Sequence, residues 1–284
     1  SSRSKNATVA PIVIQDHRLG LAYWCLPALY KSAYSRFSSL LMLNDNGAVL
    51  SPQDQTTLLQ CTRCMLLINA DCYTAWHRRK KVISHMLSSL VDNHDDTSAV
   101  AESALSSART ILHRELQFLN LLGTKHPKSG ESWHHRWWIL KKRIEIEMVM
   151  KPQNDANADS DVIDREQSLF QLLNSEMVVA ERMAVLYPRN YYAWTHRQLI
   201  VKELIRLGMT DRLLPRLIES ELRRMDDWTR RNVSDHSGFH HIMFLLQTWY
   251  RTSCQPLSSL SDHKKQQQTS PSSSNDCDND ELLL

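Results

Sequence analysis

Three cysteines and a histidine lie close together in the sequence with residue types that can bind zinc. Cys61 and Cys64 have C-x-x-C spacing, and Cys72 and His77 follow shortly after them. Thiolate sulfur and imidazole nitrogen are ligands that zinc prefers in proteins. A structural zinc site usually has a second closely spaced ligand pair, and this cluster straddles a predicted helix that needs its apolar face for packing. We therefore predict small core thiols here and assign no metal site.

A second pattern with metal-binding geometry is the histidine pair His236 and His240, spaced i, i+4 as on one helix face. Ser237 stands where an H-E-x-x-H site has its acid, and no third ligand is indicated. A helix start capped by Ser234 or Asp235 explains the segment better. The sequence has no G-x-S-x-G elbow, phosphate-binding loop or dinucleotide fingerprint. We expect no catalysis from this chain alone.

Composition limits the fold that could position any such residues. The 284 residues include 6 glycines and 9 prolines, well below the usual ~7% and ~5%. A turn-rich β sandwich or barrel needs more of both, so the composition favours an all-α chain. The net charge of +3 is too small to indicate a nucleic-acid-binding face.

Cysteine usage and hydropathy bear on location. Six cysteines spread over the whole length are typical of free thiols in a reducing compartment. No apolar run approaches the ~18 residues of a membrane span, and the first residues do not have the pattern of a signal peptide. The chain starts without Met and stops abruptly at Leu284. We expect a cytoplasmic protein and a fragment of something longer.

Helical periodicity divides the chain into three parts. Residues 1–50 are expected to be a partly helical N-terminal segment, and 51–252 a domain of helical hairpins. Residues 253–284, rich in Ser, Gln and Asp, are expected to be a disordered tail or linker. Within the domain, Ser51 and Pro52 predict one helix start, Thr210 with Asp211 another, and Asp235 the last. Residues 151–161 lack large apolar side chains and are expected to form a loop.

The second helix of each hairpin begins in a related way, which indicates internal repeats near 65–85, 122–143, 183–204 and 228–249. An aromatic residue is followed three positions later by arginine in three copies, and the fourth, weaker copy has Phe239 and then Ile242. The pairs are Trp76 with Arg79, Trp133 with Arg136, and Trp194 with Arg197. Because i and i+3 share a helix face, each arginine stem can lie along its indole and reach carbonyls or carboxylates of the adjoining hairpin. These seven aromatic and arginine residues are predicted to be structural. Histidines beside them, such as His135 and His196, are predicted to be hydrogen-bonding residues.

The repeated [P]-x-x-Y-x-x-W-x-[HR]-R pattern resembles the repeat of protein prenyltransferase α subunits over about residues 65–245. The second copy, from Pro127 to Trp138, looks most like the α subunit of Rab-type geranylgeranyl transferases. The resemblance implies a right-handed α-solenoid, a crescent of antiparallel hairpins around a separate β subunit. In the family the β subunit carries the catalytic zinc and most of the isoprenoid pocket, so no cofactor is expected in this chain.

The resemblance also implies roles for residues near the hairpin turns. Lys128, five positions before Trp133, matches the family lysine that approaches the isoprenoid diphosphate; without the resemblance it would be interpreted as a solvated loop lysine. Gly130, Glu131, Tyr191 and Tyr192 match substrate-facing positions. Gly130 replaces a tyrosine common in the farnesyl-type enzymes, and predicts a more open approach.

The function implied is that of the non-zinc α subunit of a heterodimeric protein prenyltransferase. Such an enzyme attaches an isoprenoid, geranylgeranyl rather than farnesyl, to C-terminal cysteines of protein substrates. The expected partners are a β subunit and the acceptor proteins, without nucleic acid. The alternative is a non-enzymatic α-solenoid scaffold that kept the repeat and lost the partner.

Overall fold

The computed structural model describes residues 10–16, 18–45, 50–92, 98–149 and 158–254. The elements in these ranges are β1 (Ile12–Gln15), β2 (Arg18–Leu21), the 3₁₀ turn η1 (Tyr23–Cys25), α1 (Leu26–Asp45), α2 (Pro52–Ile68), α3 (Tyr73–Asp92), α4 (Ser98–Lys125), α5 (Gly130–Val149), α6 (Ala158–Leu186), α7 (Tyr191–Arg206), α8 (Leu213–Arg231) and α9 (His236–Cys254). Of the helices in these ranges, not one has the length and hydropathy that crossing a lipid bilayer requires.

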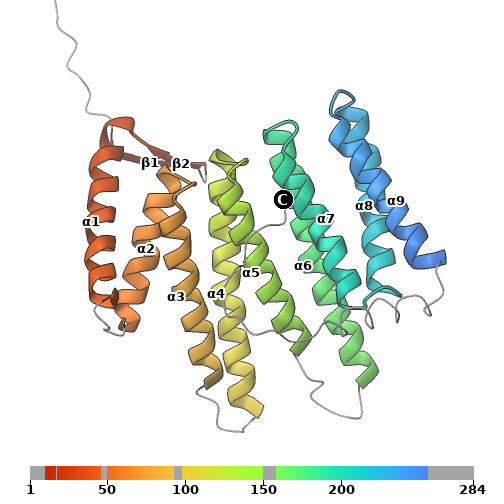
Figure 1. The fold of residues 1–284 in the computed structure, drawn as a ribbon, viewed down its shortest axis with the longest axis horizontal. Coiled ribbons are helices and arrows are strands. Elements are labelled where there is room, and N and C mark those ends of the chain that lie inside the picture. Colours follow the sequence, from red (N-terminus) through yellow and green to blue (C-terminus); the bar gives the residue numbers. More distant parts are fainter. Residues whose placement is uncertain (1–9, 17, 46–49, 93–97, 150–157, 255–284) are drawn as a thin grey trace, which may run out of the picture.

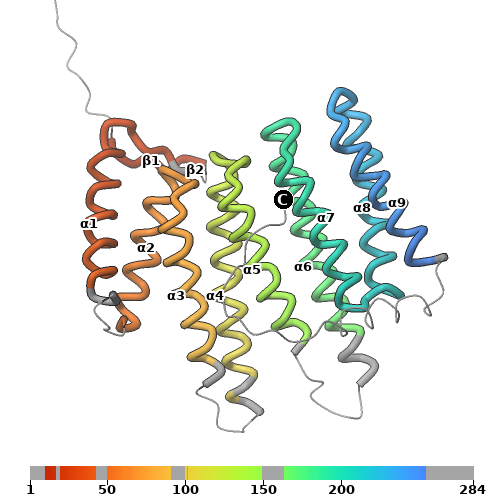
Figure 2. Tube along the Cα trace, in the orientation of Figure 1, coloured from red at the N-terminus to blue at the C-terminus, as the bar shows by residue number. Residues whose placement is uncertain are grey.

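The helices form antiparallel hairpins that stand side by side in one row, in chain order from α1 to α9 (Figure 1). The pairs are α2 with α3, α4 with α5, α6 with α7, and α8 with α9, and each pair packs against the next. The tube view shows the described helices following the same up-and-down path (Figure 2). The predicted all-α solenoid of helical hairpins is therefore confirmed. Its right-handed sense remains a prediction.

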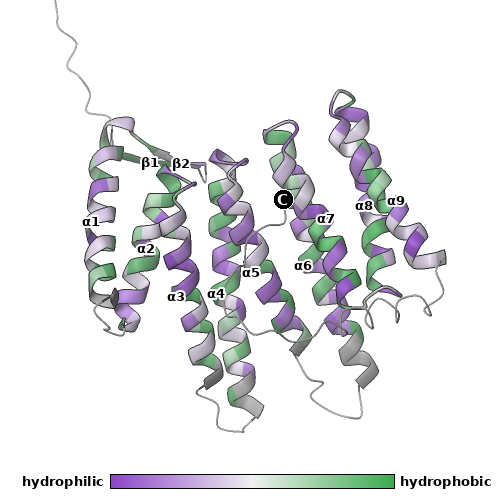
Figure 3. Ribbon diagram, in the orientation of Figure 1, coloured by the Kyte–Doolittle hydropathy of each residue, from purple (hydrophilic) through white to green (hydrophobic). Residues whose placement is uncertain are grey.

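The core runs along the row, between the first helices of the hairpins (α2, α4, α6 and α8) and the second helices (α3, α5, α7 and α9). One apolar cluster lies between α1 and α5, and a second between α5 and α9, with Leu58 and Leu112 among the buried residues of the first and Leu140 and Leu217 among those of the second. Figure 3 shows hydrophobic and hydrophilic residues alternating along most helices, as expected of amphipathic helices in a layered stack.

Two of the predicted helix starts are confirmed and one is wrong. The backbone N–H of Asp54 donates to Ser51 Oγ at 3.1 Å ahead of α2, and the N–H of Ser237 donates to Asp235 Oδ1 at 3.0 Å ahead of α9. Thr210 and Asp211 do not cap α8, which begins at Leu213. The Thr210 hydroxyl bonds to Asp211 Oδ1 instead of to the helix.

Two further expectations are corrected at the edges of the domain. Helix α6 begins at Ala158, so the last four residues of the expected 151–161 loop are helical. The N-terminal segment contains helix α1 as expected, but also the antiparallel hairpin β1–β2, in which Ile12 pairs with Leu21. Of the expected tail, Ser253 and Cys254 complete α9, and 255–284 lie outside the described residues.

Candidate functional site

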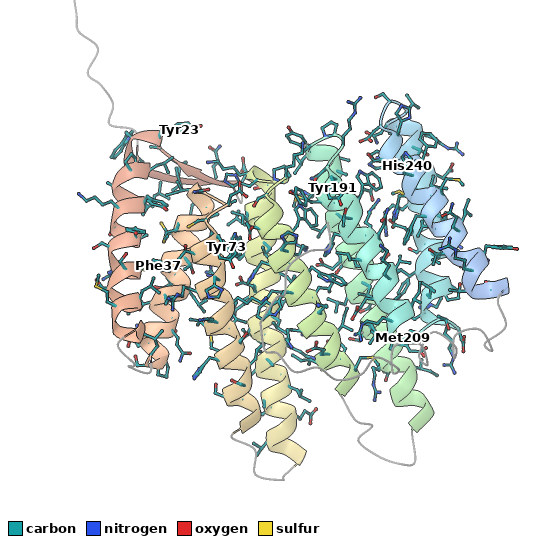
Figure 4. All side chains as sticks on the ribbon, viewed as in Figure 1. Tyr23, Phe37, Tyr73, Tyr191, Met209 and His240 are labelled. Atoms are coloured by element: carbon teal, nitrogen blue, oxygen red, sulfur yellow. The ribbon has the colours of Figure 1, made fainter. Side chains whose placement is uncertain are left out.

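The predicted site residues gather at one edge of the row, where each hairpin turns from its first to its second helix. We call this the turn edge and define it by residues 69–72, 126–129, 187–190 and 232–235. It lies at the top in Figure 1. Tyr73 and Tyr191, labelled in Figure 4, are the first residues of α3 and α7 and flank two of these turns.

Neighbouring turns are tied to each other by hydrogen bonds from the residues that precede the second helices. Ser129 Oγ lies 2.7 Å from Asp71 Oδ1, to which it donates, and Asn190 Nδ2 donates to the carbonyl of Pro127 at 2.6 Å. The backbone N–H of Arg189 donates to Asp235 Oδ2 at 2.9 Å. All four turns are therefore joined in one line along the turn edge.

The repeat tryptophans are buried beneath the turns, and two of them donate hydrogen bonds to turn carbonyls. Trp76 and Trp133 each donate the indole N–H to the carbonyl six residues earlier, at 2.7 and 2.9 Å. Trp194 is 5% exposed and packs edge-on against Trp228, with ring centroids 4.9 Å apart. The structural role predicted for these three residues agrees with their burial. Phe239 is different: its side chain is 48% exposed, because no further helix covers that face of α9 in the described residues.

The repeat arginines reach carboxylates of the adjoining hairpin, as the sequence predicted. Each pairs with a buried glutamate on the first helix of the next hairpin, and a histidine on that hairpin's second helix bonds to the same carboxylate. The three sets, one at each junction, are Arg79–Glu115–His135, Arg136–Glu176–His196 and Arg197–Glu221–His241. Every junction between hairpins therefore contains the same Arg–Glu–His triad.

The predicted contact between each arginine and its own tryptophan is present in one copy. The guanidinium carbon of Arg197 lies 5.0 Å from the ring centre of Trp194. In the first copy, Arg79 lies over Phe118 of α4, at 4.7 Å, because the guanidinium is drawn toward Glu115 on the same helix. The prediction was correct about where the arginines reach, and the contact with the arginine's own tryptophan is not seen for Arg79 or Arg136 among the described residues.

Burial and pairing fix the charges within the triads. Burial opposes ionisation of the glutamates, but the arginine and histidine beside each outweigh it and lower the pKa of Glu115, Glu176 and Glu221 to about 2. Burial lowers the pKa of His135, His196 and His241, against the pull of the glutamates. Because a carboxylate only accepts, each neutral imidazole donates its Nε2–H. The triads serve packing and contain no accessible acid or base.

Lys128 lies in the second turn, between two residues whose positions are fixed. The Pro127 carbonyl accepts hydrogen bonds from Trp133 and Asn190, and Ser129 bonds to the preceding turn. The Lys128 side chain is exposed, and no described carboxylate lies within ion-pair distance of its ammonium. An exposed cation thus projects from a well-held backbone.

The other residues implied by the resemblance lie around this lysine. Gly130 is the first residue of α5, and Tyr192 of α7 sits directly over it: a Cβ at Gly130 would lie 2.8 Å from the Tyr192 hydroxyl oxygen. Tyr191 is exposed and meets the Tyr192 ring edge-on, with centroids 5.6 Å apart. Glu131 is half-buried. The more open approach expected at Gly130 is wrong, because the tyrosine of the next hairpin fills that space.

The cysteine cluster has the properties of core packing. Cys61 is buried and Cys64 half-buried, and burial raises the pKa of both thiols. His77 is exposed on α3, where burial and the neighbouring Lys81 lower its pKa. In the ranges that the structure describes, no three potential ligands are grouped as a metal site.

Sequence reasoning missed the three triad glutamates and did not connect them with the histidines. A signal was present: Glu115, Glu176 and Glu221 each stand 20 residues before His135, His196 and His241. It also missed Tyr187, whose ring lies beneath the Lys128 ammonium at 4.5 Å. That contact joins two different hairpins, so no local spacing predicts it.

Comparisons with known proteins match this arrangement of hairpins. A family model described as "Protein prenyltransferase alpha subunit repeat" matches residues 56–86, 112–143, 173–204 and 218–249. Each matched stretch ends within the second helix of a hairpin.

Relatives named for the same repeat match most of the chain. "Protein prenyltransferase alpha subunit repeat-containing protein 1" of Homo sapiens is 31% identical over 240 residues, which are 84% of this chain and 50% of that protein. The 1-A protein of Xenopus laevis is 32% identical over 241 residues, 84% and 47% of the two chains. "Geranylgeranyl transferase type-2 subunit alpha" of Rattus norvegicus is 22% identical over 190 residues, 67% and 25%. The chain spans about half the length of the repeat-containing proteins it matches.

Proposed function

Because this chain belongs to the family built from protein prenyltransferase alpha subunit repeats, we propose that it acts as the α subunit of a heterodimeric protein prenyltransferase. The reaction proposed is transfer of an isoprenoid, geranylgeranyl rather than farnesyl, to C-terminal cysteines of acceptor proteins. Similarity to geranylgeranyl transferase type-2 α subunits supports this choice. The proposed location is the cytoplasm, where free thiols persist.

The proposed reaction divides its chemistry between two chains. An acceptor thiolate forms a bond to C1 of the isoprenoid while the C1–O bond breaks and inorganic diphosphate leaves with the electron pair. In this proposal the β subunit would supply most of the isoprenoid pocket and a zinc ion, whose chemistry would be to keep the acceptor thiol ionised. The part left to this chain is to stabilise the negative charge that develops on the departing diphosphate.

One observation carries the proposal: Lys128 is an exposed ammonium, without a carboxylate partner in the described ranges, on a turn held from both sides. A cation whose position is fixed before the reaction stabilises developing charge without reorganising. An ion pair with a neighbouring carboxylate would reduce that effect. The geometry therefore suits contact with a diphosphate.

The test is a prenylation assay on the full-length protein reconstituted with a β subunit. Lys128→Ala should slow transfer at saturating isoprenoid by roughly 10²–10³-fold, as loss of one preorganised charge contact does. Lys128→Arg should restore part of the rate, because the charge returns in a different geometry. Lys125→Ala is the matched control, since Lys125 is an exposed lysine at the end of α4. Equal turnover of wild type and Lys128→Ala would refute the role.

A non-enzymatic scaffold remains the alternative, and one observation favours it: the names of the relatives that match most of the chain state the repeat and no activity. Purification of the full-length protein from cells separates the two functions. A zinc-containing β subunit should co-purify in nearly equal amount if the chain is an enzyme subunit. Its consistent absence would favour the scaffold.

A further inference from the structure

The Lys128 ammonium lies over an aromatic ring that comes from a different hairpin. The ammonium nitrogen lies 4.5 Å from the ring centre of Tyr187, the first residue after α6. Lys128 itself belongs to the turn between α4 and α5. The lysine and its neighbour are thus brought together only when the second and third hairpins pack against each other.

The backbone around both residues is held in a way that keeps this contact in place. Asn190, three residues after Tyr187, donates its side-chain N–H to the carbonyl of Pro127, the residue before Lys128. The N–H of Tyr187 donates to Met183 at 3.1 Å, so the tyrosine is still held by α6. Arg189, between Tyr187 and Asn190, has a φ of 56°, in the left-handed region that sharp turns use.

An aromatic ring and a carboxylate attract an ammonium in different ways. The negative face of the ring attracts the cation, yet the ring carries no net charge, so the ammonium keeps its full positive charge for an anion. The Tyr187 side chain is 45% exposed, so an anion can approach the ammonium from the solvent side. The ring limits where the flexible lysine stem places its charge and leaves that charge available.

We propose that Tyr187 is a positioning residue that holds the Lys128 ammonium at the turn edge, where it meets the diphosphate. The catalytic part of this proposal rests on the function proposed above. The contact between the two side chains does not, and it can be measured in the absence of any partner.

The contact itself is tested by NMR on the full chain after reductive methylation of lysines with ¹³C-formaldehyde. The methyl signal of Lys128, identified by its loss in Lys128→Arg, should be shifted upfield by the ring current of Tyr187. Tyr187→Phe should keep the shift and Tyr187→Leu should abolish it. Tyr73→Leu, which removes an exposed tyrosine at the start of α3, is the matched control and should change nothing. An unshifted Lys128 signal in the wild type overturns the proposal.

The role in transfer is tested in the reconstituted heterodimer. Tyr187→Leu should lower kcat/KM for the isoprenoid diphosphate by about 2–5-fold, as expected for a cation–π contact at an exposed site. Tyr187→Phe should be as active as wild type. In the Lys128→Ala background, Tyr187→Leu should have no further effect, because the tyrosine acts through the lysine.

The outcomes separate this inference from the proposed function. If Lys128→Ala slows transfer but Tyr187→Leu does not, the positioning role is overturned and the proposed function stands. If Tyr187→Leu has the same effect with and without the lysine, the tyrosine acts on folding or packing and the proposal is also overturned. If the heterodimer transfers nothing while the ring-current shift is present, the proposed function fails and the contact stands.

Discussion

At the scale of single residues, the triads explain how charges can be buried between hairpins: ion pairs and hydrogen bonds offset the free energy of removing them from water. The side chains of Arg79 and Glu115 are 1% and 4% exposed, a burial that would be very unfavourable for either alone. The Arg79 guanidinium also donates to the Leu59 carbonyl and Thr62 Oγ1, and His135 donates to Oε1 of the same Glu115 carboxylate. A planar fork with five donors can satisfy all of these groups at once, which a lysine could not.

The repeat aromatics allow a matched comparison of a covered and an uncovered position. Trp194 and Phe239 have the same place in their repeats, but the first is 5% and the second 48% exposed. Trp194→Ala should lower the free energy of unfolding by about 3–5 kcal/mol, as large-to-small core changes do. Phe239→Ala should cost about 1 kcal/mol or less, since about half of its surface already contacts water. Urea titrations of the two variants measure both values. Similar losses would show that the fourth copy is packed like the others.

At the scale of helices, the triads couple each hairpin to the next and stop at both ends of the row. Twenty residues before Arg78, which holds the histidine place in the first copy, stands Leu58, buried in the first core cluster. In α9 the arginine place is Ile242. The glutamate place at one end of the row and the arginine place at the other are therefore held by apolar residues. A buried glutamate without an arginine would be an unpaired charge, which is costly. Each triad glutamate accordingly stands where the preceding hairpin supplies an arginine.

Acid should destabilise these junctions in two steps. The histidines have a folded-state pKa below the ~6.5 of an unfolded chain, so the unfolded state takes up more protons once the pH falls below about 6.5. The glutamates have a folded-state pKa of about 2, so their contribution is present above the unfolded value of ~4.3 and lost as the pH falls toward 2. The urea midpoint should therefore fall from pH 7.5 to 5.5 and fall further by pH 4.

Glutamine variants identify the source of the first step. Replacing His135, His196 and His241 with Gln keeps a side-chain N–H donor but removes the titrating ring. The variant should lose stability by acidification mainly below pH 5, with a flatter profile between 7.5 and 5.5. An unchanged slope in that interval would mean that other groups control it.

Hairpin order, two of the three helix starts and the structural residues could be predicted because each has a local sequence signal. Ser51 before Pro52 and the W-x-x-R spacing are such signals. The charge network was only half predictable: the arginines stand beside their tryptophans, whereas Glu115 lies 36 residues from Arg79 across a connection of variable length. The β1–β2 hairpin was missed because four-residue strands carry little periodicity.

The candidate site was predictable as a set of positions and not as an arrangement. The resemblance indicated Lys128, in the second turn, and Gly130, the first residue of α5. Their contacts with Tyr187 and Tyr192 depend on how the third hairpin packs on the second. Gly130 was predicted from the sequence to leave open space. Tyr192 of the adjacent repeat fills that space instead.

At the scale of the whole molecule, the row of hairpins has two edges with different properties. Along the turn edge, successive turns are tied by side-chain hydrogen bonds such as those of Ser129 and Asn190. At the opposite edge, the described link between α7 and α8 includes Thr210 and Asp211, which bond only to each other through their side chains. Inserted residues should therefore be tolerated at the second edge and harmful at the first.

Insertion of a short flexible peptide tests this difference. A ten-residue Gly/Ser segment between Thr210 and Asp211 should change Tm by no more than a few degrees, since it adds mainly loop-closure entropy. The same segment between Arg189 and Asn190 should lower Tm much further, because it separates two residues that bond to different neighbouring turns. Differential scanning calorimetry gives both values. Equal losses would mean that the tied turns contribute little.

This asymmetry has a practical consequence for binding measurements. A biotin-acceptor peptide inserted between Thr210 and Asp211 would anchor the molecule to a sensor surface by the edge opposite the turns. Every immobilised molecule would then present Lys128 and its neighbours to the solution in one orientation. A soluble partner that binds the turn edge would meet a uniform population of sites. For a partner that binds elsewhere, the binding signal would change when the anchor peptide is inserted at a different position.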